Sequence, residues 1–264
     1  MIREKLFKLV ISSSSLIFLF IIWHLVAIIS GSNIIPTPIE VVEEFLKISF
    51  IGDNFGYLLI EHIFASLLRV LIGFFYAAVI AIPLGIFMGV FRKLEWALSP
   101  IFELLRPIPP FAWIPFALIL FGLGIASQSF VIFIGAFFPI LTNTVDGVKR
   151  TSNIYIDVAK TLGANKLDII MRIVLPSALP SILVGLRIGL GVGWMCVIAA
   201  ELVGLNIPLG LGYLIQYSAQ FGNFGLTVSA MLTTGLIGIL MTISVKLIEN
   251  WLLDWRNNIA KNKA

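Results

Sequence analysis

The stretch Asp157–Pro176, DVAKTLGANKLDIIMRIVLP, lies between long apolar runs, yet five of its residues carry a charge. The chain around it is 59% hydrophobic. A charged side chain at the centre of a bilayer costs roughly 2.5–3.5 kcal/mol, so a stretch of this composition belongs in water rather than in lipid. The stretch therefore separates one set of apolar segments from another.

The composition of the whole chain indicates a membrane protein. Its 264 residues have a mean hydropathy of +1.05, and only 12% are charged. Soluble domains carry roughly 25% charged residues, so lipid must cover much of this surface. The net charge of +4 is scattered over short segments, which favours a record of membrane topology over a nucleic-acid partner. The one cysteine, Cys196, lies in an apolar run and has no partner for an internal disulfide.

The apolar runs predict six membrane-spanning helices, because each span needs about 20 mostly apolar residues. The first run is longer than the apolar core of a signal peptide, so we expect it to be retained. The predicted fold class is an all-α membrane protein with one transmembrane domain over residues 1–264. The spans are expected near 9–29, 66–91, 111–123, 129–144, 182–203 and 226–247.

The basic residues orient these spans. Fourteen of the 18 Lys and Arg residues fall in segments on one side, if the N-terminus is cytoplasmic, and only Lys47 falls in an outer segment. Positive loops stay inside, so both termini and the stretch 157–176 are predicted to be cytoplasmic. In the outer segment, Pro38 is expected to open an amphipathic surface helix with Glu40, Glu43 and Glu44 near its start.

Local signals predict a helical hairpin around the charged stretch. Ser152 is a candidate N-cap for one short helix, and Gly163 is a candidate stop because glycine tolerates positive φ. Asn165 is a candidate cap for a second helix, with Asp168 three residues later. Pro176 is expected to end that second helix.

The spacing of the stretch resembles a family signature. Asp157-Val-Ala, three residues, Gly163, nine residues, Ile173, one residue and Leu175-Pro176 is similar to E-A-A-x3-G-x9-I-x-L-P of ATP-binding-cassette (ABC) importer permeases. Asp157 replaces Glu and Val158 replaces Ala. Segments such as LLRPIPPFAWIPFALILFGLG and LPSALPSILVGLRIGLGVGW extend the resemblance from about Ile35 to Trp255, towards the nitrate, sulfonate, taurine and bicarbonate permeases.

The resemblance implies a type I importer permease fold in the cell membrane, with a transporter core of about 62–248. It also implies a cytoplasmic coupling helix between spans four and five, within about 152–176. This helix would dock on an ATPase subunit. The working unit would hold two copies of this chain, two ATPase subunits and an external solute-binding protein. The residues implied in docking are Tyr155, Asp157, Val158, Ala159, Lys160, Leu162, Gly163 and Ala164, with Ile173, Leu175 and Pro176 completing the motif.

The chemistry of catalysis is missing from the sequence. No G-x-x-x-x-G-K-[ST] phosphate loop occurs, so ATP and Mg²⁺ are expected on the ATPase partner and this chain is not expected to be an enzyme. His24 and His62 are isolated in the sequence, so no metal site is predicted. The resemblance implies a small anionic solute of the sulfonate or taurine, nitrate or bicarbonate class, with a vitamin precursor as the alternative.

Several intramembrane residues are candidates for the translocation path or its gate: Trp113, Asn143, Gly189, Gly193, Trp194 and Glu201. Gly185, Gly189 and Gly193 share a helix face, which suits either ordinary helix packing or the path. Glu201 is either a gate residue or a partner of an outer group, and Arg69 and Arg187 either snorkel or form pairs. The prolines of 107–115 exclude a straight helix there.

Two features remain open at this level. The outer segment 204–225 has no charge and many glycines, which suits a re-entrant or gate-forming loop with Tyr213 and Gln216 as contacts for a binding protein. The alternatives to an ATP-driven permease are an ATP-independent transporter or channel, and a membrane scaffold. The first alternative gives no use for the complete pattern of 157–176, and the second gives none for the aligned prolines and the glycine face.

Overall fold

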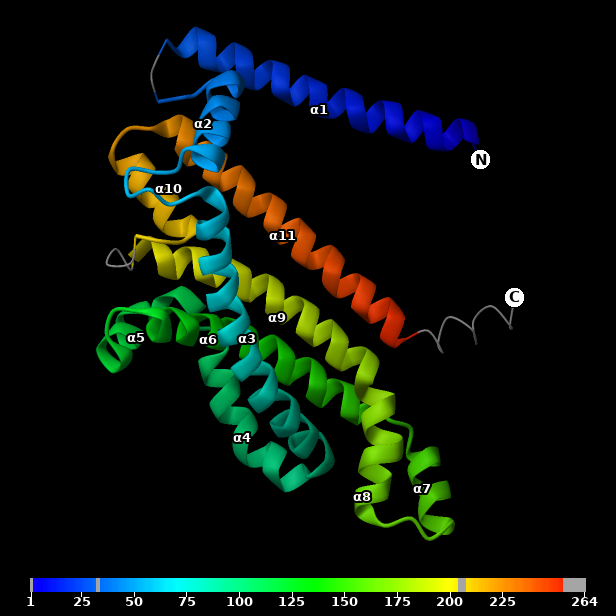
Figure 1. Ribbon diagram of the computed structural model, residues 1–264. Coiled ribbons are helices and arrows are strands. Elements are labelled where there is room, and N and C mark those ends of the chain that lie inside the picture. The colour runs from blue at the N-terminus through cyan, green and yellow to red at the C-terminus, as the bar shows by residue number, and fades with distance from the viewer. Residues whose placement is uncertain (1, 32–33, 204–207, 254–264) are drawn as a thin grey trace. The chain divides into compact units, whose positions relative to one another are not determined.

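The computed structural model describes residues 2–31, 34–203 and 208–253, and every regular element in these ranges is a helix (Figure 1). The chain divides into two compact units. The first unit comprises residues 1–64 and 208–235, and the second comprises 65–207 and 236–264. Each is described here by itself, and the single transmembrane domain expected over 1–264 stays a prediction.

The first unit consists of helices and of parts of two longer helices. It contains α1 (Ile2–Ser30), α2 (Pro38–Phe50), α10 (Leu211–Gln220) and the first turns of α3 (Leu59–Val90) and α11 (Phe224–Leu252). The helix predicted to open at Pro38 is confirmed as α2, and its place at the outer surface stays a prediction. Pro38 is in its first turn, and Thr37 and Glu40 form a reciprocal capping box.

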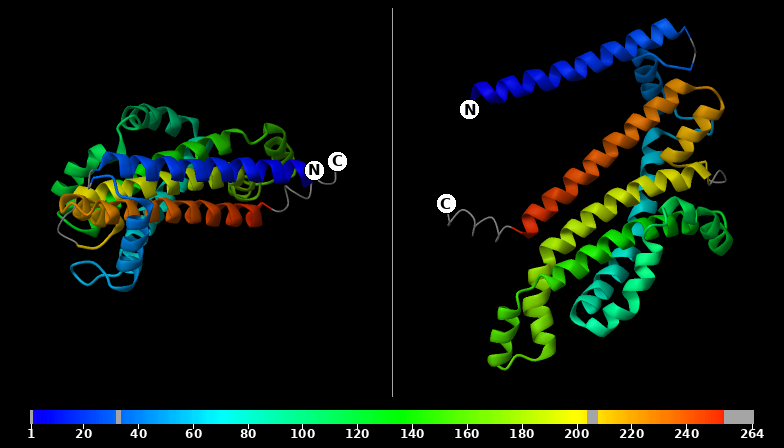
Figure 2. Two further views of the ribbon diagram at one scale, coloured as in Figure 1. Left: turned by 90° about the horizontal axis from the view of Figure 1, so that it is seen from above. Right: turned by 180° about the vertical axis from the view of Figure 1, so that it is seen from behind.

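The second unit has a pair of long helices at its centre. These are α6 (Ile125–Lys149) and α9 (Leu175–Val203), which run side by side in both views (Figures 1 and 2). The unit also holds the rest of α3 and α11. Its other elements are α4 (Arg92–Leu105), the 3₁₀ turn η1 (Pro110–Trp113), α5 (Ile114–Phe121), α7 (Asn153–Thr161), α8 (Lys166–Ile169) and the π-helical turn η2 (Ile170–Val174).

Small residues let α6 and α9 approach closely. A Cβ atom added to Gly185 would lie 2.8 Å from Cβ of Asn143, and one added to Gly189 would lie 2.9 Å from Cγ1 of Ile140. On the facing helix, a Cβ on Gly135 would lie 2.5 Å from Sγ of Cys196. Glycine on both helices therefore brings the two backbones together, as small residues do in membrane helix pairs.

Four helices in the described ranges are long and apolar enough to span a membrane, and a fifth span results if one bent pair counts as one. The four are Leu59–Val90, Ile125–Lys149, Lys166–Val203 and Phe224–Leu252, and the bent pair is Arg92–Leu105 with Pro110–Phe121. The sequence predicted six spans, and the difference lies at the first one. There the apolar helix among the described residues, Ile17–Ser30, is shorter than the other spans. The predicted break near the third span is confirmed as a 90° bend at the prolines.

The predicted helix end at Pro176 is wrong. Residues Lys166–Val203 form one span of 38 residues that passes through Pro176. A proline within a helix lacks one N–H donor and clashes with the carbonyl four residues earlier. Here the preceding turn, η2, is π-helical. The wider π turn changes the pattern of backbone hydrogen bonds just before Pro176, which has no N–H to donate. The helix therefore continues past the proline.

Candidate functional site

The charged stretch folds into a hairpin, residues 153–169, which we call the cytoplasmic hairpin. At the end of α7, Gly163 has φ +83° and donates its N–H to Lys160 O. The N–H of Ala164 reaches Ala159 O at 3.0 Å. These two bonds form the Schellman motif that glycine favours at helix ends. Asn165 then caps α8 by accepting the N–H of Asp168 at 2.9 Å, as predicted. Ser152 precedes α7, as predicted, but its side chain makes no cap bond.

One side of the cytoplasmic hairpin is apolar and exposed. Val158 is 54% exposed and Leu162 is 81% exposed, and Tyr155 is exposed beside them. Ile154 and Leu167 extend the same exposed set. A cluster of exposed apolar side chains on a water-facing segment is typical of a surface that another molecule covers.

Some of the other predicted motif residues face inward. Ala159 is buried in a cluster with Val148, Ile169 and Val174, and Ala164, Ile173 and Leu175 pack against that cluster. These residues hold α7 against the start of the long helix. Asp157 and Lys160 form an exposed ion pair at 3.0 Å, and an exposed pair of this kind contributes at most about 1 kcal/mol. The motif therefore divides into an inner set that builds the hairpin and an outer set that is free to contact a partner.

Glu201 is paired with two side chains of α3. It is 1% exposed, accepts hydrogen bonds from Oγ of Ser66 at 2.9 Å, and forms an ion pair with Arg69. Arg69 therefore pairs rather than snorkels. Arg187 also pairs, with Glu249 of α11 at 3.0 Å. A role of Glu201 as a gate residue stays a prediction, but its charge is balanced within the second unit.

The other path candidates lie at helix contacts. Gly185, Gly189 and Gly193 face α6, so their spacing is explained by packing within the chain. Asn143 donates to Pro139 O at 2.8 Å. Trp194 is buried against α11, where a Cβ on Gly238 would lie 3.1 Å from its ring. Trp113 Nε1 is buried with no hydrogen-bond partner in the described residues. Their roles on the path stay predictions.

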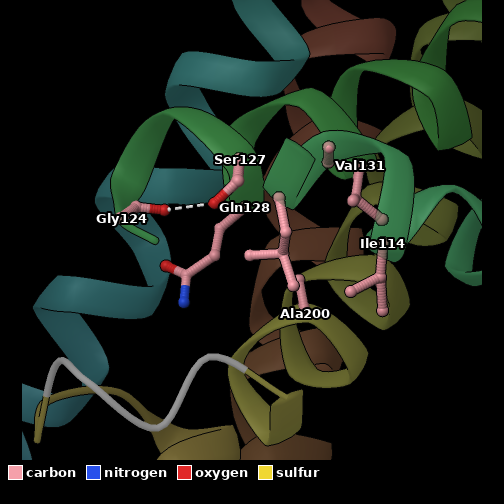
Figure 3. Close-up of a pocket in the computed structure, with 8 residues that line it drawn as sticks. Ile114, Gly124, Ser127, Gln128, Val131 and Ala200 are labelled. Atoms are coloured by element: carbon pink, nitrogen blue, oxygen red, sulfur yellow. Dashed lines mark hydrogen bonds between the residues drawn. The ribbon is translucent and has the colours of Figure 1, made fainter. Parts of the chain in front are cut away.

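A small, mostly apolar pocket was not signalled by the sequence (Figure 3). Ser127 and Gln128 of α6 line it together with Ile114, Ala200 and others, and Figure 3 shows Ser127 bonded to Gly124 O at 2.9 Å. Its space of about 10 Å³ suits about one water molecule. Gln128 Oε1 is buried without a partner in the described part of the chain. Only three consecutive polar residues, Ser127, Gln128 and Ser129, near the start of an apolar run mark this position in the sequence.

The first unit contains a buried polar contact that sequence reasoning missed. His62, which is isolated in the sequence, lies with Nε2 3.4 Å from Oδ2 of Asp53. Its Nδ1 is 3.1 Å from the backbone of Gly210. Residues 53 and 62, which are close in sequence, and the distant residue 210 therefore meet at one imidazole. Among the described residues, no group of three His, Cys, Asp or Glu side chains is placed to hold a metal ion.

The expected outer loop is mostly helical where it is described. Residues 204–207 lie outside the described ranges, and Leu211–Gln220 form α10. Tyr213 is buried and stacked on Tyr217 with ring centres 5.7 Å apart. Burial raises the pKa of the Tyr213 hydroxyl. Gln216 is half-buried. The use of Tyr213 and Gln216 as contacts for a binding protein stays a prediction.

Comparisons with known proteins agree with one another. Residues 81–256 match the family model of binding-protein-dependent transport system inner membrane components. A putative ABC transporter permease protein of Methanocaldococcus jannaschii is 43% identical, over 89% of this chain and 88% of the relative. The taurine transport system permease protein of Escherichia coli is 33% identical, over 96% and 92%. The bicarbonate transport system permease protein of Synechococcus elongatus is 37% identical, over 95% and 92%.

A solved structure shares the fold. A chain of the MetNI methionine ABC transporter, in an inward-facing conformation, matches with a TM-score of 0.62. The match covers 73% of this chain and 94% of that one, at 21% identity. At this identity the likeness shows the fold alone, which agrees with the predicted permease architecture.

Proposed function

Because the chain belongs to the family of binding-protein-dependent transport system inner membrane components, we propose that a cytoplasmic ATPase subunit holds it by the cytoplasmic hairpin. The chain is the multi-pass membrane permease subunit of an ABC importer. The observation that carries the docking proposal is the exposed apolar side of the hairpin, above all Val158 and Leu162. An ATPase surface that covers these side chains removes them from water.

The hairpin is built to pass a displacement into the membrane. The Ala159 cluster fixes α7 to α8, and α8 continues through η2 into α9 as one span from Lys166 to Val203. When ATP draws two ATPase subunits together, each α7 moves and α9 moves with it. Since α6 packs along α9 through glycine contacts, the pair moves as one body. The far end of α9 is anchored to α3 through Glu201 and Arg69.

The assembly that we propose contains two copies of this chain, two ATPase subunits and an external solute-binding protein, all held at the lipid membrane. The family description, binding-protein-dependent transport, supports the external protein. ATP and Mg²⁺ are bound by the ATPase subunits, since this sequence contains no phosphate-binding loop. A second copy would cover apolar side chains of α9, such as Ile188 and Met195, that are exposed in a single chain.

The solute that we propose is a small anion of the sulfonate or taurine, nitrate or bicarbonate class. Two relatives, the taurine and the bicarbonate transport system permease proteins, support this class. One buried polar atom of the second unit adds support. Trp113 Nε1 is a neutral donor that has no hydrogen-bond partner among the described residues. Neutral donors bind an anion weakly enough to release it, which a transport path requires.

The first experiment separates ATP-driven import from the alternatives. The permease is reconstituted with its ATPase and binding protein in proteoliposomes, and uptake of labelled taurine, nitrate and bicarbonate is measured. We expect uptake of one of these anions only with ATP on the ATPase side. Uptake that is unchanged without ATP would contradict the proposal.

The second experiment tests the docking site at Gly163. A Cβ at this position meets nothing within 4 Å in the chain, so Gly163→Ala and Gly163→Trp share one backbone strain of about 1–2 kcal/mol. They differ in the bulk offered to a partner. We expect Gly163→Ala to keep co-purification with the ATPase, and Gly163→Trp to lose it together with coupled ATPase activity. Equal behaviour of the two variants would show that no partner surface lies close to Gly163.

A further inference from the structure

A groove of about 910 Å³ opens in the second unit beside the cytoplasmic hairpin. Its walls come from the end of α3, the first turn of α4, the end of α6, and from α7, α8 and η2. Docking of the exposed apolar side of the hairpin does not use these residues. The groove is therefore a feature that the proposed function leaves unexplained.

The groove is strongly basic. Arg92, Lys149, Lys160 and Lys166 line it, with Glu95 as the one lining carboxylate. Lys149 is neutralised by Glu95, and Lys160 by Asp157. Arg92 and Lys166 form no ion pair within the described ranges. Two positive charges thus remain in the groove without a counter-charge from the described residues.

Two helices begin at the groove without a side-chain cap. The starts of α4, at Phe91 and Arg92, and of α7, at Asn153, are part of its lining. Neither the residue before α4 nor Ser152 before α7 makes a side-chain cap bond. The first N–H groups of a helix have no partner within the helix and carry its positive dipole end. Both helix starts therefore offer donors to an anion.

A buried hydroxyl supplies an independent sign of a ligand. Thr151 is 8% exposed and lines the groove, and its Oγ1 has no hydrogen-bond partner among the described residues. A buried polar group without a partner is costly, by about 1–3 kcal/mol. A ligand oxygen in the groove would satisfy this hydroxyl.

We propose that the groove binds a phosphate-type oxyanion, with Arg92 and Lys166 supplying the charge and Thr151 and the two helix starts supplying donors. A phospholipid headgroup and free inorganic phosphate share this chemistry. Trp96 lines the groove, is exposed, and lies with its ring 4.9 Å from the Arg92 guanidinium. A tryptophan beside cations is typical of the membrane interface, so an anionic lipid headgroup is the favoured source. The bound oxyanion would brace the hairpin against the cytoplasmic end of α3.

The test uses the full chain in nanodiscs of phosphatidylcholine. Inorganic phosphate is titrated at constant ionic strength, and the midpoint of thermal unfolding is compared with that in chloride. A parallel series replaces part of the lipid with phosphatidylglycerol. A midpoint raised by phosphate identifies a soluble oxyanion, and one raised by phosphatidylglycerol, with no further effect of phosphate, identifies a headgroup. Both results support the site, and a midpoint that neither ligand raises overturns it.

Variants connect the response to the groove. We expect the double variant R92Q/K166Q to weaken the binding of the oxyanion, as read from this response, at least tenfold. A hydrogen bond to a charged group changes the affinity by roughly that factor or more. The control is Lys93→Gln, which removes an adjacent exposed charge that does not line the groove. A response retained in R92Q/K166Q, or lost equally in Lys93→Gln, overturns the proposal.

Thr151→Val tests the hydroxyl separately from folding. Valine keeps the shape of threonine and removes an unpaired buried oxygen, so the ligand-free midpoint is expected to stay the same or rise. The response to phosphate or phosphatidylglycerol is expected to fall several-fold. If Thr151→Val responds like the unchanged chain, Thr151 does not contact the ligand and the proposed site is wrong.

Discussion

At the scale of single residues, the structure explains how a carboxylate is held within the membrane. Glu201 lies near the end of α9, and its two partners, Ser66 and Arg69, both come from α3. Ser66 and Arg69 are three positions apart and therefore share one helix face. The ion pair balances the two charges, and either charge alone would carry the full cost of desolvation.

We expect Glu201→Ala to destabilise the chain strongly, by about 3–5 kcal/mol, because Arg69 would be left buried without a counter-charge. The double variant Arg69→Met/Glu201→Ala should be more stable than either Arg69→Met or Glu201→Ala alone, since it removes both charges. The free energy of unfolding of the two single variants and the double variant is compared by thermal unfolding in one detergent. A double variant whose loss equals the sum of the two single losses would show that the residues do not interact.

At the scale of helices, the close contact of α6 and α9 depends on which face each glycine occupies. A Cβ atom added to Gly185 would lie against Asn143 and the backbone of Ile140. Gly191, in the same helix, has nothing within 4 Å of an added Cβ. The two glycines have the same chemistry, and only their positions around the helix differ.

This contrast gives a matched pair of variants. Gly185→Ala should cost about 1–3 kcal/mol, because the added carbon meets a neighbouring Cβ at 2.8 Å and backbone at 3.2 Å. Gly191→Ala should be neutral or stabilising by up to about 1 kcal/mol, since alanine favours the helix. The unfolding midpoints of the two variants, measured side by side, test this. A stable Gly185→Ala would mean that the helices can separate at little cost.

At the scale of the whole molecule, the two sides of the membrane are distinguished by charge. The outer segment carries most of the carboxylates that precede the second span, and the segment that contains the hairpin carries Lys149, Arg150, Lys160, Lys166 and Arg172. Basic segments stay on the cytoplasmic side. The same asymmetry puts the apolar side of the hairpin where an ATPase is found.

Labelling with a membrane-impermeant maleimide tests this topology. The natural Cys196 is buried, so it contributes little background. Asn54→Cys, in the outer segment, should be labelled in intact cells, and Leu162→Cys, in the hairpin, only after the membrane is opened. Both positions are exposed in the structure, so a difference in labelling between them reports the side of the membrane on which each lies. Labelling of Leu162→Cys in intact cells would contradict both the topology and the docking proposal.

The membrane class, the topology, the hairpin and its glycine turn were determined by the sequence alone. Apolar length, the bias of basic residues and the capping preferences of Gly163 and Asn165 act within a few residues of the chain, so a local pattern carries them. The same local reasoning failed at Pro176. It treated the proline as a helix end, whereas a π-helical turn accommodates it.

Only the tertiary structure decided which polar groups meet. Glu201 finds Arg69, His62 finds Asp53 and Gly210, and Thr151 joins Arg92 and Lys166 at one groove. It also decided that Gly185 faces α6 while Gly191 does not. Such pairings depend on how segments far apart in the chain are packed, and no spacing along the sequence encodes the distance between two side chains on different helices.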